Sequence, residues 1–194
     1  MTVKYGKFEI PEEIKIEEEK EHYAKFIAEP FERGFGHTLG NAFRRIMLTG
    51  LEAPAIISFR MEGAHHEYCA MENIVEDMTN IVLNLKGGKL RYLPDEEEFS
   101  RDIRKVSNVL EVSQKEIDDS NGMYKVTLKK ILGDTEFEIL NEETHIMTVT
   151  KPIKKKVDFK IGFGRGYVPS ERIEGIERVK DEIFLDVEYS IHPN

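Results

Sequence analysis

Apolar residues recur at helical spacing after a glycine-rich turn, Gly34-Phe-Gly36. The pattern predicts a helix over residues 38–49, because Thr38 is suited to cap its N-terminus and Gly50 to end it. At about 100° per residue, four side chains share one side of this helix: Leu39, Phe43, Ile46 and Met47. We expect this side to be buried.

A second helix is predicted by a continuous apolar stripe that ends at Gly87-Gly88. The stripe consists of Ile74, Val75, Met78, Ile81, Val82 and Leu85. Its length and regularity make it the clearest periodic pattern in the chain.

Most other patterned segments alternate between apolar and polar residues, which is typical of strands with one buried face. These segments are residues 23–28, 57–62, 123–128, 135–140, 145–150, 157–161 and 183–191. Residues 95–120 are charged and weakly patterned, so we expect a loop or short strands there. The basic run at 154–156 is expected on an exposed strand edge. Two helices among many strands, without regular alternation, predict an α+β fold.

Composition and charge narrow the class of protein. The hydrophobic share is 40% and the charged share 34%, which predicts a packed core. No apolar run is long enough to span a membrane and no signal segment is apparent, so a soluble chain is expected. The single cysteine, Cys69, excludes an internal disulfide and is typical of intracellular proteins. A net charge of −9 disfavours a free-standing nucleic-acid binder.

The glycine turns do not fit phosphate-binding motifs. A P-loop requires Gly-Lys-Ser/Thr, whereas Gly40 is followed by Asn41, and a dinucleotide motif requires glycine where Leu39 stands. The glycines of residues 162–166 are followed by Tyr167-Val-Pro169, which cannot open the helix that such a site needs. No nucleotide or other cofactor is predicted.

His65, His66 and Cys69 are the residues closest to a catalytic or metal-binding pattern. Adjacent residues of an extended segment point to opposite sides, so the two histidines are not expected to converge on one ion. A Cys–His nucleophile would need an orienting third group, and none is evident. A stand-alone hydrolase using these residues is therefore a minor alternative, and no metal site or catalytic residue is predicted.

Both predicted helices also carry a leucine away from their apolar stripe. Leu48 falls between Arg44 and Arg45 on the side of the first helix opposite the stripe, where we expect it to be exposed. Leu83 occupies the equivalent place on the second helix. Arginines around an exposed apolar residue are typical of protein–protein hot spots. These residues predict an interaction surface.

One segment of the chain resembles a known family. Residues 31–48 read Phe-Glu-Arg-Gly-Phe-Gly-His-Thr-Leu-Gly-Asn-Ala-Phe-Arg-Arg-Ile-Met-Leu, which closely resembles the signature of the alpha subunit of bacterial-type DNA-directed RNA polymerase. Leu-Asn-Leu-Lys-Gly at 83–87 and Gly-Arg-Gly-Tyr-Val-Pro at 164–169 match two further motifs of this family in the expected order. The resemblance is densest over residues 31–87.

The resemblance implies an assembly scaffold that belongs to the polymerase but is itself non-catalytic. The family fold has two subdomains, which map here to a dimerisation subdomain at 1–52 and 175–194 and a strand-rich insert at 53–174. The implied homodimer interface contains Leu39, Gly40, Phe43, Ile46 and Met47. Glycine at position 40 would let a second backbone approach closely.

The resemblance also implies docking of two large subunits of the beta and beta-prime type. The implied docking residues are Arg44, Arg45, Leu48, Leu83, Lys86, Ser170, Arg172 and Glu174. Within this set Arg45 is assigned to the beta-type subunit, and the segment after the motif at 164–169 to the beta-prime type. Neither a cofactor, nor direct DNA binding, nor a membrane contact is implied. The implied compartment is the bacterial cytosol, with the plastid as an alternative.

Two further expectations follow from the resemblance. Family members continue past the position of Asn194 into a long dimerisation helix and a DNA-binding domain, so the dimerisation subdomain is expected to be incomplete here. An assembly subunit of the archaeal or eukaryotic type shares Gly-His-Thr-Leu-Gly-Asn at 36–41 and is the main alternative. Tyr167-Val-Pro169 favours the bacterial or plastid type.

Overall fold

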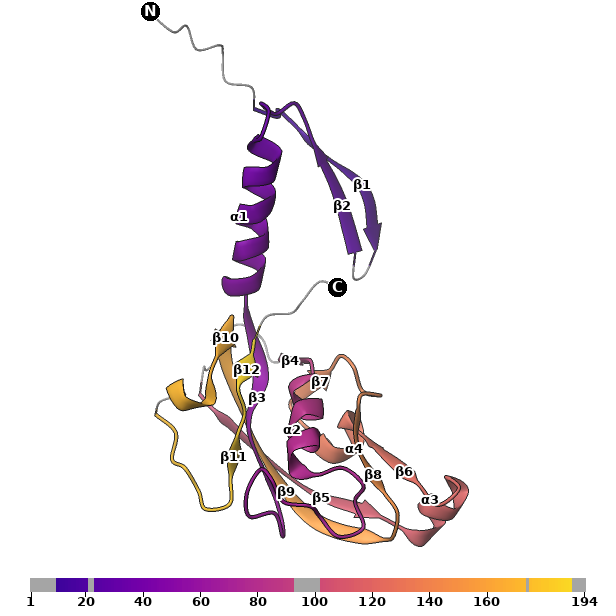
Figure 1. The fold of residues 1–194 in the computed structure, drawn as a ribbon. Helices are drawn as coiled ribbons and strands as arrows, with labels where there is room; N and C mark the ends of the chain where they lie inside the picture. The colour runs from indigo at the N-terminus through magenta and orange to yellow at the C-terminus, as the bar shows by residue number, and fades with distance from the viewer. Residues whose placement is uncertain (1–9, 21–22, 93–101, 174, 190–194) are drawn as a thin grey trace, which may run out of the picture. The chain divides into compact units, whose positions relative to one another are not determined.

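The computed structural model describes residues 10–20, 23–92, 102–173 and 175–189 (Figure 1). It combines helices with a strand-rich sheet, so the predicted α+β class is confirmed. The chain divides into two compact units, Met1–Met47 and Leu48–Asn194. Each unit is described by itself.

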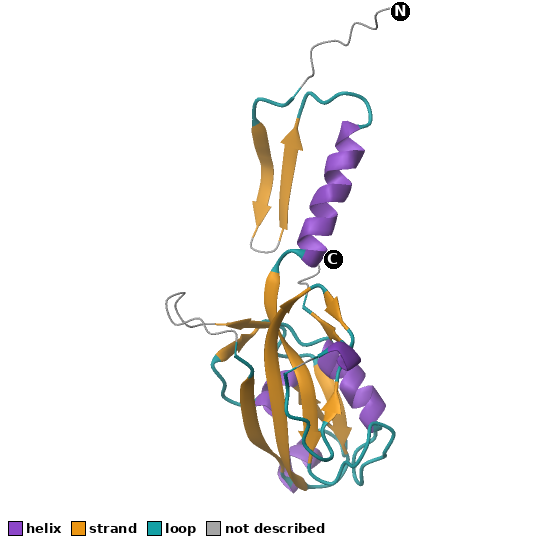
Figure 2. Ribbon diagram, turned by 90° about the vertical axis from the view of Figure 1, so that its left-hand side faces the viewer, coloured by secondary structure: helices purple, strands orange, loops and turns teal. Residues whose placement is uncertain are grey.

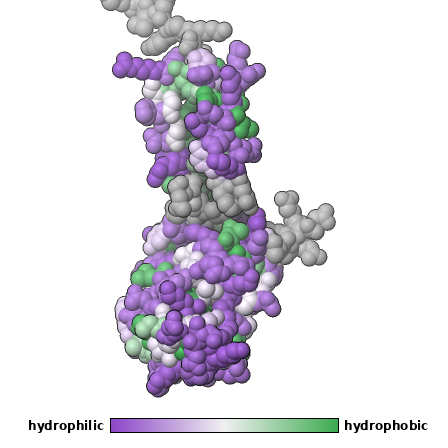
Figure 3. All heavy atoms as spheres, turned by 90° about the vertical axis from the view of Figure 1, so that its right-hand side faces the viewer, coloured by the Kyte–Doolittle hydropathy of each residue, from purple (hydrophilic) through white to green (hydrophobic). Residues whose placement is uncertain are grey.

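The first unit contains a two-stranded antiparallel hairpin and most of the first helix. The hairpin pairs β1 (Ile14–Lys20) with β2 (Tyr23–Ala28), and Ile16 lies opposite Phe26. The predicted strand at 23–28 is therefore present, but Phe26 is exposed and no residue of β2 is buried. Hydrophobic atoms are visible at the surface of this unit on its hairpin side (Figure 3).

Helix α1 (Phe35–Thr49) begins before Thr38. The predicted cap is wrong, because Thr38 lies in the first turn and its hydroxyl donates to the Gly34 carbonyl at 3.4 Å. Gly34 has a φ of 94°, a conformation that favours glycine, and the chain enters the helix directly after it. None of the side chains of α1, all of which are described, is buried.

An antiparallel four-stranded sheet forms the centre of the second unit (Figure 2). Its order is β11 (Ile183–Phe184), β3 (Glu52–Met61), β9 (Ile153–Arg165) and β5 (Arg104–Val112). The expectation that the strand at 57–62 has one buried face is wrong, because β3 is buried on both faces. One face contributes Phe59 to the main core, and Ile57 packs with Val187 and Tyr189 in a second, small cluster.

Shorter elements surround this sheet. They are α2 (Met78–Lys86), β4 (Leu90–Tyr92), α3 (Gln114–Asp119), β6 (Tyr124–Thr127), α4 (Leu128–Leu132), β7 (Phe137–Ile139), β8 (His145–Val149), β10 (Tyr167–Val168), a 3-10 helix at Ser170–Arg172 and β12 (Val187–Glu188). Three antiparallel pairs form among them: β4 with β7, β6 with β8, and β10 with β12.

Helix α2 starts later than its apolar stripe predicts. The Asp77 side chain accepts a hydrogen bond from the Asn80 amide at 2.8 Å and caps a helix that begins at Met78. Ile74 is still buried, because it precedes the helix on a segment that packs on the core, whereas Val75 is exposed. The predicted helical start at Ile74 is therefore wrong.

Several other strand boundaries also differ from the predicted ones. The weakly patterned region of residues 95–120 contains the nine-residue strand β5 and helix α3, and its residues 95–101 lie outside the described chain. The strand predicted at 123–128 gives way to α4 at Leu128, and the one predicted at 183–191 is split into β11 and β12. The basic run at 154–156 lies in β9 and pairs there with β5 on one side only, because the ladder of β3 with β9 ends at Met61 opposite Val157. Lys154 and Lys156 are exposed, as expected of such an edge.

Candidate docking surfaces

Two predicted docking segments, far apart in sequence, meet in the second unit. Leu83 and Lys86 of α2 and Ser170 of the 3-10 helix line one cavity of about 200 Å³. Phe184, the last residue of β11, and Asp186, which lies two residues beyond it, line the same cavity. We call this cavity and its rim the α2 surface.

Asp186 joins the two segments through its two carboxylate oxygens. Oδ1 accepts a hydrogen bond from the Ser170 amide at 3.0 Å, and Oδ2 lies 3.4 Å from Nζ of Lys86. The bond from the Ser170 backbone is the main cause of a lowered pKa of Asp186, and the charge of Lys86 adds to it. The carboxylate therefore stays ionised at neutral pH and holds the lysine at the rim.

Apolar side chains flank this charged pair. Leu83 is 55% exposed, as predicted for a leucine away from the stripe, and Tyr68 is exposed beside the same cavity. Thr79 of α2 donates a hydrogen bond to the Glu67 carbonyl at 2.7 Å, which fixes the loop that carries Tyr68. Of these side chains, tyrosine is the type enriched at interface hot spots, and Leu83 adds apolar area beside it.

Sequence reasoning missed Tyr68, Phe184 and Asp186 as members of this surface. Asp186 is an acidic residue inside an otherwise apolar run, Ile183 to Val187. This break in the run could have indicated a specific role, but the pattern predicts only part of a strand there. Tyr68 follows a histidine pair and has no periodic pattern around it. Its position becomes apparent only from the loop that the Thr79 bond fixes.

Packing and backbone conformation explain why glycine occupies positions 164 and 166 of the motif at 164–169. A Cβ on Gly164 would lie 2.5 Å from the buried Tyr189 ring, and Gly166 has a φ of +61°. The Tyr189 amide donates to the Gly166 carbonyl at 2.9 Å. This turn leads directly to Ser170 and so helps to place the α2 surface. Of the remaining predicted residues, Arg172 is exposed and Glu174 lies outside the described chain.

The predicted docking residues of α1 are partly as expected. Arg44 and Arg45 are exposed, but Leu48 is half-buried rather than exposed. Gly166 lies close by: a Cβ built on it would be 3.7 Å from the Leu48 carbonyl oxygen. This neighbour comes from a distant part of the chain, so helical periodicity could not reveal it.

Among the described residues of the first unit, the predicted dimer residues of α1 form a stripe that is largely exposed. Phe43 is 60% exposed, Ile46 and Met47 are exposed too, and Leu39 is half-buried. A Cβ on Gly40 would meet nothing within 4 Å. The stripe is therefore an apolar surface with room for close approach of another backbone.

The histidine and cysteine residues make separate contacts. Nδ1 of His65 lies 3.6 Å from Asp181, whereas Nδ1 of His66 accepts a hydrogen bond from the Tyr68 amide at 3.2 Å. The Cys69 carbonyl accepts from the Met78 amide at 3.0 Å, at the start of α2. Within the described part of the chain, no three His, Cys, Asp or Glu side chains are grouped so that they could hold a metal ion.

Comparison with known proteins identifies the family. Residues 57–190 match the sequence model of the RNA polymerase Rpb3/RpoA insert domain. The chain belongs to this family. It is 55% identical over 192 residues to the DNA-directed RNA polymerase subunit alpha of Protochlamydia amoebophila (strain UWE25), a match that covers 98% of this chain and 52% of the relative.

A second relative agrees with the first. The chain is 37% identical over 164 residues to the DNA-directed RNA polymerase subunit alpha of Geobacter metallireducens (strain ATCC 53774 / DSM 7210 / GS-15), covering 84% of this chain and 44% of the relative. The resemblance to bacterial alpha subunits is thereby confirmed, and the chain spans about half the length of these relatives. Among the described helices, none combines the length and the apolar character needed to cross a membrane.

Proposed function

We propose that this chain is an assembly subunit of a DNA-directed RNA polymerase that forms a homodimer and docks the beta-type and beta-prime-type large subunits. The observation that carries the proposal is its similarity, over nearly its whole length, to subunits named as polymerase alpha subunits in two bacteria. The chain itself would be non-catalytic, would need no cofactor and would act in the cytoplasm. The purified chain is expected to incorporate no nucleotides.

The uncovered stripe of α1 supports the dimer. Phe43, Ile46 and Met47 are large apolar side chains that remain exposed, and such a contiguous patch is typical of a protein interface. A second copy of the same stripe would cover it in a two-fold, self-complementary contact. Gly40 costs about 1 kcal/mol against alanine inside a helix, so close packing at this position is a physical reason for its presence.

The division into a dimerisation part, residues 1–52 and 175–194, and an insert, residues 53–174, stays a prediction. In the second unit, β11 pairs with β3 and β12 pairs with β10. Strands β11 and β12 of the predicted dimerisation part therefore each pair with a strand of the predicted insert.

The α2 surface supports docking of a large subunit. Leu83 and Tyr68 offer apolar area, and Lys86 offers a cation whose place is set by Asp186. We assign this surface to the beta-prime-type subunit and Arg45 of α1 to the beta-type subunit. The two proposed contacts share no residue, so a single substitution should weaken one contact and leave the other intact.

A capture experiment with the two purified large subunits tests these assignments. The chain is immobilised, and each subunit is titrated against wild type, Lys86→Glu and Arg45→Ala. We expect Lys86→Glu to weaken capture of the beta-prime-type subunit, and Arg45→Ala that of the beta-type subunit, each by about 2 kcal/mol. Glu72→Gln, an exposed site outside both surfaces, is the control. Unchanged capture by both variants would contradict the docking assignments.

A further inference from the structure

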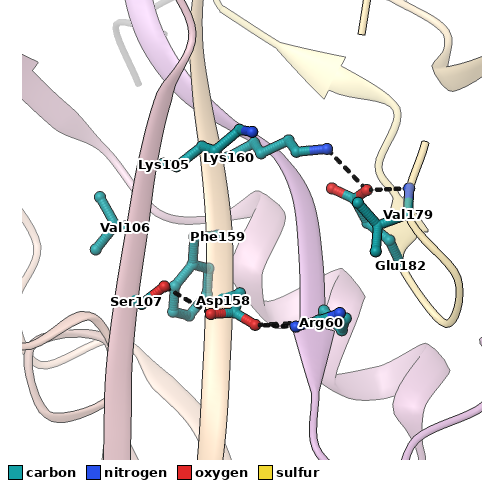
Figure 4. A pocket seen from close by; sticks show the side chains of 9 residues that line it. All are labelled: Arg60, Lys105, Val106, Ser107, Asp158, Phe159, Lys160, Val179 and Glu182. Atoms are coloured by element: carbon teal, nitrogen blue, oxygen red, sulfur yellow. Dashed lines mark hydrogen bonds and ion pairs between the residues drawn. The ribbon is translucent and has the colours of Figure 1, made fainter. Parts of the chain in front are cut away.

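A buried ion pair contacts the ring of Phe184, which lines the α2 surface. Nζ of Lys160 lies 2.8 Å from Oε2 of Glu182, and the two side chains are only 9% and 5% exposed (Figure 4). The same Nζ lies 5.7 Å from the centroid of the Phe184 ring. The pair therefore links strand β9 to the segment that enters the α2 surface.

Every charged atom of this pair has a structural partner. Glu182 also accepts a hydrogen bond from the Ser58 hydroxyl. It accepts a further one from the Val179 amide at 3.1 Å (Figure 4). Lys160 donates a second bond, of 2.7 Å, to the Glu177 carbonyl. Burial raises the pKa of Glu182, and the bonds that it accepts lower the pKa by more. The two charges thus tie β3 and β9 to the loop before β11.

The segment after this loop has few other constraints. Strand β11 is two residues long, with Ile183 opposite Phe59 and Phe184 opposite Ser58. The next bond to β3 is from the Leu185 amide to the Ile57 carbonyl at 3.0 Å. So short a strand supplies few ladder hydrogen bonds, and its position depends on how its ends are held.

We propose that Lys160 and Glu182 are positioning residues for the α2 surface: they hold the entry of β11 so that Phe184 lines the cavity and Asp186 contacts both Lys86 and Ser170. This inference rests on the proposed docking function and adds the residues that set the geometry of the docking surface. No periodic signal in the sequence marks this pair, because its partners are brought together only by the sheet.

A buried ion pair need not stabilise the fold, so a positioning role of Lys160 and Glu182 can be tested separately from a contribution to stability. Replacing both charges of such a pair by apolar side chains is often neutral or stabilising, whereas removing one charge is strongly destabilising. Lys160→Met/Glu182→Leu is therefore expected to fold. It lacks the bonds to the Val179 amide and the Glu177 carbonyl, which no apolar side chain can replace.

The test combines hydrogen exchange with capture, using the whole chain. The double variant is compared with Lys154→Met/Glu111→Leu, which removes an exposed ion pair of 2.9 Å between β9 and β5, with side chains 69% and 61% exposed. Exchange is followed at the amides of Ser170 and Leu185, and at those of β5 and β9 as the reference for global opening. Capture of the beta-prime-type subunit is measured in parallel.

We expect the Lys160→Met/Glu182→Leu variant to exchange at Ser170 and Leu185 about tenfold faster or more, with β5 and β9 unchanged, because local opening is independent of global unfolding. Its capture should weaken by about the same factor, while the control variant behaves as wild type. Wild-type exchange at both amides would overturn the inference, as would equal acceleration across the whole sheet.

The proposed function can fail separately. If Lys86→Glu leaves capture unchanged, the docking assignment is wrong whatever the exchange shows. If Lys86→Glu abolishes capture but the Lys160→Met/Glu182→Leu variant captures normally, docking stands and the positioning role is wrong.

Discussion

The two longest described helices carry the same kind of apolar stripe but differ in what covers it. On α2, Met78, Ile81 and Leu85 are buried against the sheet and the surrounding strands. On α1, Phe43 and Ile46 of the equivalent stripe are exposed. In both helices, apolar residues recur at the i, i+3 and i+4 spacing that predicts one buried side.

The difference teaches that periodicity identifies the face that has to be covered but not the molecule that covers it. Helix α2 packs against strands that follow it in sequence, β8 in particular. The Asn84 side chain donates a hydrogen bond to the Ile146 carbonyl of β8 at 2.9 Å. Leaving an apolar stripe such as that of α1 in water forgoes about 25 cal/mol for each Å² that could be buried. A second chain is the simplest cover, and the following predictions test this comparison.

Truncation of one residue in each stripe should give the largest contrast. Ile81→Ala is expected to lower the free energy of unfolding by about 2–5 kcal/mol, because Ile81 is fully buried and leaves a cavity. Phe43→Ala should change it by no more than about 0.5 kcal/mol at a concentration too low for self-association. Urea unfolding followed by circular dichroism measures both. A comparable loss in the two variants would show that α1 is covered within its own chain.

Self-association should depend on the stripe of α1 and not on α2. We expect the wild-type chain to populate a concentration-dependent mixture of monomer and dimer, and Phe43→Asp to weaken the dimer by about 2 kcal/mol or more. Leu83→Asp, which places the same change on the exposed side of α2, should leave the dimer intact. Sedimentation over a wide concentration range decides the matter. A wild-type chain that stays monomeric at the highest concentration contradicts the role of α1.

Two glycine substitutions sharpen the comparison. Gly164→Ala should destabilise the second unit by about 1–3 kcal/mol, because the new Cβ would lie 2.5 Å from the buried Tyr189 ring. Gly40→Ala should stabilise α1 by about 1 kcal/mol, because its Cβ meets nothing and alanine is the better helix former. Thermal unfolding measures both. If Gly40→Ala also weakens the dimer, the glycine serves close approach; if it strengthens the dimer, that reason for Gly40 is wrong.

Local patterns predicted the existence of both long helices, the α+β class and the exposed leucine at position 83. They failed where tertiary neighbours decide. Helix α2 begins at Met78 because the Asp77 side chain caps it, although the apolar stripe continues back to Ile74. Residues 95–120 were expected to form a loop or short strands, and they contain the nine-residue strand β5. Its length was not predictable, because its exposed face carries Lys105, Ser107 and Glu111 and its pairing with β9 comes from a segment far along the chain.

The docking surface was only half predictable for the same reason. The motifs at 83–87 and 164–169 pointed to Leu83, Lys86 and Ser170, but no pattern in the chain shows that they share one cavity. That fact depends on Asp186, which binds both segments. Pairing of β11 with β3 brings it there.

The smallest expected effect concerns the start of α3, where Glu116 finds its hydrogen-bond partners within the second unit. Glu116 of α3 accepts bonds from the Ser113 amide and from Lys130, and these lower its pKa to about 2. Because the folded-state pKa lies below the unfolded one, this stabilisation is fully present above about pH 4.5 and is lost as the pH falls towards 2. Since the carboxylate is partly solvent-exposed, we expect Glu116→Gln to cost only about 1 kcal/mol at pH 7, the order of a helix cap, and less at pH 3. Melting temperatures of wild type, Glu116→Gln and the exposed control Glu72→Gln between pH 3 and 7 measure the difference. A cost for Glu116→Gln that is independent of pH would mean that its shape, and not its charge, supports α3.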